Sequence, residues 1–349
     1  MTYFIMTLGC QMNISDSQRI ESKLNSLGYE SASEQEADLV VVNSCSVRQK
    51  GIDRIWGGIK KWRAGGKQIL ITGCVLESDR KKYAARDIQF LHIDDLPHLS
   101  SVIPDRTGSG SGIQNNNNVN HYLDIIPELS GSIAYIPIMT GCNNFCSYCA
   151  VPYTRGREVS RKPEDITAEV KIALNKGFEE IWLLGQNVNS YDFDFSKLLQ
   201  AVDNFEGDFK FNFISSNPQD MSDELIETFS NLKKWTKELH LAMQSGDDEI
   251  LRKMNRKCTS TQFLELVDKL KSKIQNLKLS TDIIVGFPSE TEEQFNHTFD
   301  ACQKIGFFKA YVNQYSPRVG TVSAKMKDDV PASDKKRRWE ILDQLINHK

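Results

Sequence analysis

Short runs of apolar, aromatic and β-branched residues alternate with polar segments of helical periodicity in the first hundred residues. These runs lie at residues 3–8, 38–42, 68–72 and 89–93. Near-continuous apolar strands separated by helices are typical of a parallel sheet covered on both faces. The pattern therefore predicts an N-terminal doubly wound α/β domain over residues 1–104.

The same alternation resumes after residue 133. Apolar runs lie at residues 135–139, 180–184, 210–214, 238–243, 279–285 and 309–315. Helices are expected at 163–175, which begins with a proline, and at 291–305, which a glycine follows. Six β/α units are too few for a closed eight-stranded barrel, so we expect an open partial β/α barrel over residues 133–349, with chemistry on the strand-end loops.

Residues 105–132 separate these two parts. Between residues 104 and 120 the sequence is rich in Gly, Ser and Asn, a composition that cannot build a core. It predicts a flexible linker.

Composition narrows the functional class. The formal net charge is -3, which argues against non-specific binding of polyanions, so any RNA contact must be local. No run of 18 apolar residues and no export signal occur. Eight cysteines are too sparse for a disulfide scaffold and suit metal binding in a reducing compartment. We expect a cytoplasmic monomer without a membrane partner.

Cys142, Cys146 and Cys149 form an unequal C-x3-C-x2-C triplet. A closed structural metal site needs four ligands, so three thiolates from one loop indicate an open metal position. A 4Fe-4S cluster held in this way leaves one iron free to chelate S-adenosylmethionine. The alternative is a zinc knuckle or a set of reduced structural thiols.

Three further cysteines, Cys10, Cys45 and Cys74, follow the first, second and third predicted strands. Ligands bind beyond the carboxyl ends of strands in open parallel sheets. We therefore expect the three thiols to meet at one sheet edge as a second three-thiolate cluster, with Gly9 and Gly73 permitting close backbone approach. Three independent buried cysteines are the alternative.

Polar residues and glycines follow several strands of the second domain. The candidates for cofactor contacts are Gly185, Gln186, Ser215, Gln244 and Gly286. The segment after the triplet combines an aromatic residue with arginines, which suits base stacking and phosphate binding. Its candidates for substrate contacts are Tyr153, Arg155, Arg157 and Arg161. Ordinary turn and solvated-loop roles are the alternatives, and Cys258 and Cys302 are expected to be structural.

Four cysteine motifs together resemble those of the radical S-adenosylmethionine methylthiotransferase family. They lie at residues 8–13, 43–48, 72–74 and 141–149, and the last includes Tyr148, which we add to the candidate cofactor contacts. The resemblance covers nearly the whole chain. Residues 152–161 and 184–191 look most like the members that act at C2 of isopentenylated adenosine 37 in the tRNA anticodon loop.

The resemblance implies a division of labour between two 4Fe-4S clusters. The cluster at Cys10, Cys45 and Cys74 would carry the sulfur, and that at Cys142, Cys146 and Cys149 would generate the radical. One S-adenosylmethionine would supply the methyl group and a second the 5'-deoxyadenosyl radical. The partners implied are tRNA, a sulfur donor and an electron donor such as flavodoxin or ferredoxin.

One feature of the family is not expected in this chain. Its members usually continue into a C-terminal RNA-binding β-barrel, the TRAM domain, whereas this sequence ends after a predicted helix that begins near residue 333.

Two alternatives to methylthiolation of isopentenyladenosine tRNA stay open. One is a sibling methylthiotransferase, acting on threonylcarbamoyladenosine in tRNA or on a ribosomal-protein aspartate. The other is a non-catalytic iron–sulfur electron-transfer protein.

Overall fold

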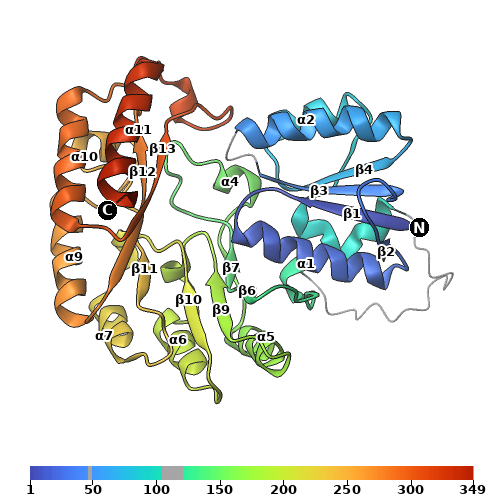
Figure 1. The fold of residues 1–349 in the computed structure, drawn as a ribbon, viewed down its shortest axis with the longest axis horizontal. Helices are drawn as coiled ribbons and strands as arrows, with labels where there is room; N and C mark the ends of the chain where they lie inside the picture. Colours follow the sequence, from blue (N-terminus) through green and yellow to red (C-terminus); the bar gives the residue numbers. More distant parts are fainter. Residues whose placement is uncertain (46–48, 104–120, 349) are drawn as a thin grey trace.

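The computed structural model describes residues 1–45, 49–103 and 121–348. Two α/β units lie side by side, an N-terminal one and a larger C-terminal one (Figure 1). The predicted linker lies outside the described residues from 105 to 120, as do Ser46, Val47 and Arg48 of the second cysteine motif.

The N-terminal unit is a five-stranded parallel sheet in the order β2-β1-β3-β4-β5. Its strands are β1 (Thr2–Thr7), β2 (Glu30–Ser31), β3 (Leu39–Cys45), β4 (Gln68–Cys74) and β5 (Gln89–Phe90). Its helices are α1 (Gln11–Ser26), α2 (Gln49–Ala64) and α3 (Glu77–Ala84), with 3-10 helices η1 (Ile93–Ser101) and η2 (Tyr122–Asp124). Along β3, Leu39 and Val41 join one hydrophobic cluster while Val40 and Val42 join the other. The sheet is therefore buried on both faces, and the predicted doubly wound fold is confirmed.

The C-terminal unit is an open partial β/α barrel, as predicted. Its parallel strands are β6 (Ile133–Pro137), β9 (Glu180–Leu184), β10 (Lys210–Phe213), β11 (Glu238–His240), β12 (Lys278–Val285) and β13 (Lys309–Gln314). They form two three-stranded sheets, β10-β9-β6 and β11-β12-β13. Isolated parallel bridges near β10 and β11, such as that between Phe211 and Trp235, connect the two sheets.

Helices cover the outside of these strands (Figure 1). They are α5 (Pro163–Asn175), α6 (Phe195–Asp203), α7 (Asp223–Asn231), α9 (Ser260–Lys273), α10 (Glu292–Ile305) and α11 (Ala332–Asn347). The loops that follow the strands carry the short helices α4 (Val151–Thr154) and α8 (Asp248–Lys253), the antiparallel pair β7 (Met139–Thr140) and β8 (Val159–Ser160), and 3-10 helices η3 (Val188–Ser190), η4 (Pro218–Asp220) and η5 (Ser323–Lys325). Both helices predicted from their end residues are confirmed: Pro163 lies in the first turn of α5, and Gly306 ends α10 in the left-handed conformation.

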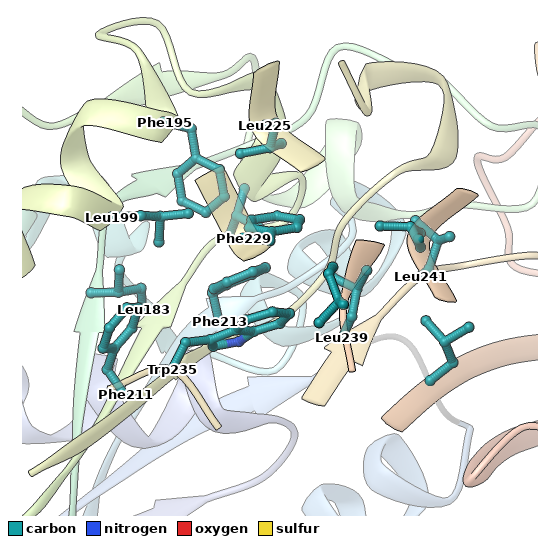
Figure 2. Packing of buried hydrophobic residues seen from close by; sticks show 14 of the residues in the cluster. Leu183, Phe195, Leu199, Phe211, Phe213, Leu225, Phe229, Trp235, Leu239 and Leu241 are labelled. Atoms are coloured by element: carbon teal, nitrogen blue, oxygen red, sulfur yellow. The ribbon is translucent and has the colours of Figure 1, made fainter. Parts of the chain in front are cut away.

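Aromatic stacking fills the barrel core (Figure 2). Phe213, Phe229 and Trp235 all contact one another: the Phe213 ring centroid lies 5.2 Å from that of Phe229 and 5.5 Å from that of Trp235, and the last two are 5.1 Å apart. Phe195 makes an edge contact with Phe213. Offset and edge contacts of this kind add to the hydrophobic burial of the rings. This core fixes β10 and β11, whose carboxyl ends carry two of the candidate cofactor contacts.

Helix α1 joins the two units. Its Ser15 hydroxyl donates to the Tyr135 carbonyl of β6 at 2.9 Å. Arg19, also on α1, donates to both carboxylate oxygens of Glu169 on α5 at 2.8 Å, and Arg161 pairs with the same carboxylate. The side chains of Arg19, Glu169 and Arg161 are all buried. The two units therefore share a buried cluster in which one carboxylate pairs with two guanidinium groups.

Candidate functional site

Cys10, Cys45 and Cys74 meet at the carboxyl edge of the N-terminal sheet. Cys45 and Cys74 end the neighbouring strands β3 and β4 and lie opposite each other in the register. Cys10 is the N-cap residue of α1, and a Cβ atom on Gly9 would come within 2.9 Å of the Cys45 Cβ. The structure thus brings together three cysteines that are far apart in sequence.

An asparagine pair holds these loops together. The side-chain amide of Asn13 donates from Nδ2 to Asn43 Oδ1 at 3.0 Å and to the Ser44 carbonyl at 3.1 Å. Asn43 donates in return to the Asn13 carbonyl at 2.8 Å. Both side chains are fully buried. This reciprocal pair fixes the start of α1, and with it Cys10, against the end of β3 that carries Cys45.

Gly73 leaves no room for a side chain next to Cys74. It has φ of +85°, and an added Cβ would lie 2.2 Å from Asn43 Oδ1. We expect Gly73→Ala to disrupt the asparagine pair and to lose the iron bound at the N-terminal cysteines, as iron analysis of the purified protein would measure.

Gly66→Ala is the matched control. Gly66 has φ of +69° with nothing within 4 Å of an added Cβ, so it carries only the cost of the left-handed conformation, about 1–2 kcal/mol. Equal iron retention in both variants would contradict the steric argument.

Cys142, Cys146 and Cys149 lie in the loop that leads from β7 to α4. The Cys142 amide donates to the Gly156 carbonyl at 3.2 Å, and the Cys149 amide to the Cys146 carbonyl at 3.0 Å. Ser147, between them, is fixed to the α8 end because its amide and hydroxyl donate to the Met254 and Lys253 carbonyls. The loop is therefore held at the carboxyl end of the barrel strands, where the sequence pattern predicted it.

Each set of three cysteines has an arginine at one sulfur: Arg155, at Cys74, is buried, and Arg256, at Cys146, is half-buried. Arg155 Nε lies 2.9 Å from Cys74 Sγ, and Arg256 Nη1 lies 3.8 Å from Cys146 Sγ. Arg256 also donates to Asn217 Oδ1 and to the Ala242 carbonyl. The sequence pattern predicted Arg155 as a substrate contact and did not single out Arg256. The contacts of these arginines with cysteine sulfurs join residues that are far apart in sequence.

Three candidate cofactor contacts, Gln186, Ser215 and Gln244, lie on loops at the carboxyl ends of the barrel strands. Gln186 Oε1 accepts from the Gly141 amide at 2.6 Å, which ties the loop after β9 to the cysteine loop. Ser215 and Gln244, after β10 and β11, both have φ of +71°. Left-handed backbone at non-glycine residues costs energy and is concentrated at functional sites.

The remaining candidates lie in packed surroundings. Tyr148 packs against the cluster of Ile250, Met254, Phe287 and Tyr315. A Cβ on Gly185 would lie 2.7 Å from Met139 Cγ, and one on Gly286 would lie 2.2 Å from Lys335 Cγ. The Gly286 amide donates to Glu290 Oε2 at 2.6 Å. Gly185 and Gly286 thus permit close packing at their strand ends.

The four candidate substrate contacts divide into two groups. Tyr153 and Arg157 are exposed, and both contact Phe145 of the cysteine loop: the Arg157 guanidinium lies 4.3 Å from the ring centroid. Arg155 and Arg161 are 3% and 8% exposed, and each makes a buried ion pair, with Asp16 and Glu169 respectively. Phe145, which is half-buried and has φ of +48°, contacts both exposed side chains and was not singled out from the sequence.

Two family descriptions match the chain. Residues 136–302 match the radical SAM superfamily, named for S-adenosylmethionine, and residues 2–92 match a family described as uncharacterized protein family UPF0004. A tRNA-2-methylthio-N(6)-dimethylallyladenosine synthase of Thermoanaerobacter sp. (strain X514) is 42% identical over 99% of this chain and 78% of that protein. Synthases of the same name from Lachnoclostridium phytofermentans and Clostridium botulinum (strain Hall) are 40% and 38% identical, over 98% and 99% of this chain and 79% and 81% of theirs. The chain belongs to the radical S-adenosylmethionine methylthiotransferase family.

Solved structures share the fold of this methylthiotransferase. The radical S-adenosylmethionine methyltransferase TsrM from Kitasatospora setae aligns with a TM-score of 0.61 at 12% identity, over 93% of this chain and 76% of that one. The cobalamin-dependent S-adenosylmethionine radical enzyme OxsB aligns with a TM-score of 0.62 at 12% identity, over 99% and 55%. Within the described part of the methylthiotransferase, no helix has the length and apolar character needed to cross a membrane.

Two sets of three cysteine thiols provide the type of ligand that iron–sulfur clusters take. Burial raises the pKa of the Cys74 and Cys149 thiols to about 12 and that of Cys142 to about 11, and thiols of its own trio raise each pKa further. Metal binding must therefore displace protons from these sulfurs. No three His, Cys, Asp or Glu side chains among the described residues are arranged around a single metal ion.

Proposed function

We propose that this enzyme transfers a methylthio group to C2 of N6-isopentenyladenosine at position 37 of tRNA. The observation that carries the proposal is the presence of two sets of three cysteines in a chain that aligns over 99% of its length with a tRNA-2-methylthio-N(6)-dimethylallyladenosine synthase. We assign residues 1–104 to the methylthiotransferase domain and 133–349 to the radical domain.

In this proposal each trio holds one 4Fe-4S cluster with an open iron. Cys142, Cys146 and Cys149 bind the cluster that takes S-adenosylmethionine, and Cys10, Cys45 and Cys74 bind the auxiliary cluster. When bound, the two clusters supply reductive cleavage of one S-adenosylmethionine and a site for the sulfur that a second one methylates. The protein binds and positions these groups. Six thiols that must stay reduced suit the cytoplasm.

The cofactor would lie against the strand ends of the barrel. Gln186, Ser215 and Gln244 lie on loops at this mouth, and Tyr148 lies in the cysteine loop itself. We propose these four as the contacts for S-adenosylmethionine, with Gly185 and Gly286 allowing the close approach of their strand ends.

The anticodon loop would contact the exposed rim next to the cysteine loop. Tyr153 and Arg157, with Phe145 between them, offer an aromatic face and a guanidinium group, the combination that stacks on unpaired bases and binds phosphate. An electron donor such as flavodoxin or ferredoxin and a sulfur donor complete the proposed partners. The enzyme would act as a monomer.

Nucleoside mass spectrometry tests the proposal. Isopentenyladenosine tRNA is incubated anaerobically with reconstituted protein, sulfide, dithionite and S-adenosylmethionine, and we expect a methylthio product at adenosine 37. Threonylcarbamoyladenosine tRNA and the ribosomal-protein aspartate are the parallel substrates. A methylthio product on one of these alone would establish a sibling activity. Iron binding without 5'-deoxyadenosine release would indicate an electron-transfer protein.

A further inference from the structure

Arg155 links the two cysteine trios across the domain boundary. Its main chain follows α4, six residues after Cys149, and its amide donates to the Val151 carbonyl at 2.8 Å. Its side chain points the other way and reaches the N-terminal unit, where Nε lies 2.9 Å from Cys74 Sγ. One residue thus lies six positions after the last cysteine of one set and contacts a sulfur of the other set.

The guanidinium charge is buried and has one counter-ion among the described residues. Arg155 Nη2 donates to Asp16 Oδ2 at 2.5 Å, and Nη1 donates to the Tyr122 hydroxyl at 3.2 Å. Arg155 is 3% exposed and Asp16 is fully buried. Charges removed from water act on their neighbours with little screening, so this cation and this anion both act on whatever binds at Cys74.

Hydrogen bonds to cluster sulfurs and nearby charge are two of the means by which proteins set the potential of an iron–sulfur cluster. A positive charge at a ligand sulfur favours the reduced, more negative state, and a negative charge disfavours it. Arg155 supplies both the N–H donor and the positive charge.

We propose that Arg155 is a positioning residue that holds Cys74 and, in balance with Asp16, sets the reduction potential of the auxiliary cluster. The inference rests on the proposed cluster at Cys10, Cys45 and Cys74. It assigns Arg155 a role apart from tRNA contact, which remains with the exposed rim.

The test uses the full chain with Cys142, Cys146 and Cys149 all replaced by alanine, which leaves the auxiliary site alone. The potential is measured by a redox titration monitored by electron paramagnetic resonance. We expect Arg155→Gln to lower it and Asp16→Asn to raise it. A tenfold change in the one-electron equilibrium corresponds to about 59 mV. Opposite signs are expected only from charge, because general damage to the site would move both variants in one direction.

Arg157→Gln is the matched control, since Arg157 is two residues away and its guanidinium lies over Phe145. Its potential should equal that of the parent. Arg155→Lys should keep the charge and restore part of the shift. Loss of iron from Arg155→Gln would leave Asp16→Asn as the deciding variant.

Equal potentials in the parent, Asp16→Asn and every iron-binding Arg155 variant would overturn the role of Arg155 while leaving the auxiliary cluster in place. Absence of iron from the parent with the triple alanine replacement would overturn the cluster assignment itself, and this inference with it.

Discussion

Cys142→Ala is expected to abolish the release of 5'-deoxyadenosine, whereas Cys10→Ala is expected to spare that release and to stop methylthio transfer. The physical reason is the separation of the two trios: Cys142 lies in the barrel loop, and Cys10 lies at the edge of the N-terminal sheet. Removing one thiolate from a three-thiolate site leaves two ligands, too few to retain a cluster. Each variant should therefore keep about half of the wild-type iron. Chromatography of the nucleoside products and iron analysis measure both effects.

Cys258→Ala is the matched control for this pair. Cys258 belongs to neither trio, and its thiol donates to the Thr259 carbonyl instead. It should keep wild-type iron and both products. Loss of the same single activity from Cys142→Ala and Cys10→Ala would show that the two sites do not have separate roles.

Most of the fold could be predicted because most of its strands coincide with runs of apolar, aromatic or β-branched residues. The predicted bounds of the barrel strand at 180–184 and of the helix at 163–175 match those of β9 and α5, and the helix predicted at 291–305 differs from α10 by one residue at its start. The strand β2 and the pair β7 and β8 were not predicted. Each spans two residues, too few for apolar and polar positions to alternate. β5 is equally short, but it begins the apolar run at 89–93 that predicted it.

The meeting of three cysteines at one edge of the N-terminal sheet could be predicted for a different reason. Parallel strands bring their carboxyl ends to one edge whatever their order in sequence, so Cys10, Cys45 and Cys74 needed only correct strand assignments. The arginines needed more. Arg155 lies in a segment that reads as an exposed basic loop, yet its partners Asp16 and Cys74 are 139 and 81 residues away. Side-chain direction across a domain boundary depends on docking, which no local pattern encodes.

Docking of the two units depends on Glu169. Its carboxylate faces Arg19 of α1 and Arg161 of the barrel, each at 2.8 Å, and the three side chains are almost fully buried. Glu169→Gln keeps the shape of the side chain but leaves two buried cations without their shared anion. Removing one partner of a buried ion pair costs about 3–5 kcal/mol. We expect a loss of this size in the free energy of unfolding measured with urea.

Glu164→Gln, the same substitution at an exposed position of α5, should change the free energy of unfolding by less than about 0.5 kcal/mol. The two variants also separate stability from geometry. Because Arg19 belongs to the N-terminal unit and Glu169 to the barrel, weaker docking should let the trios separate. Methylthio transfer should then fall further than 5'-deoxyadenosine release, which needs the barrel site alone. An equal fall in both products would mean that Glu169 stabilises the barrel without holding the two sites in register.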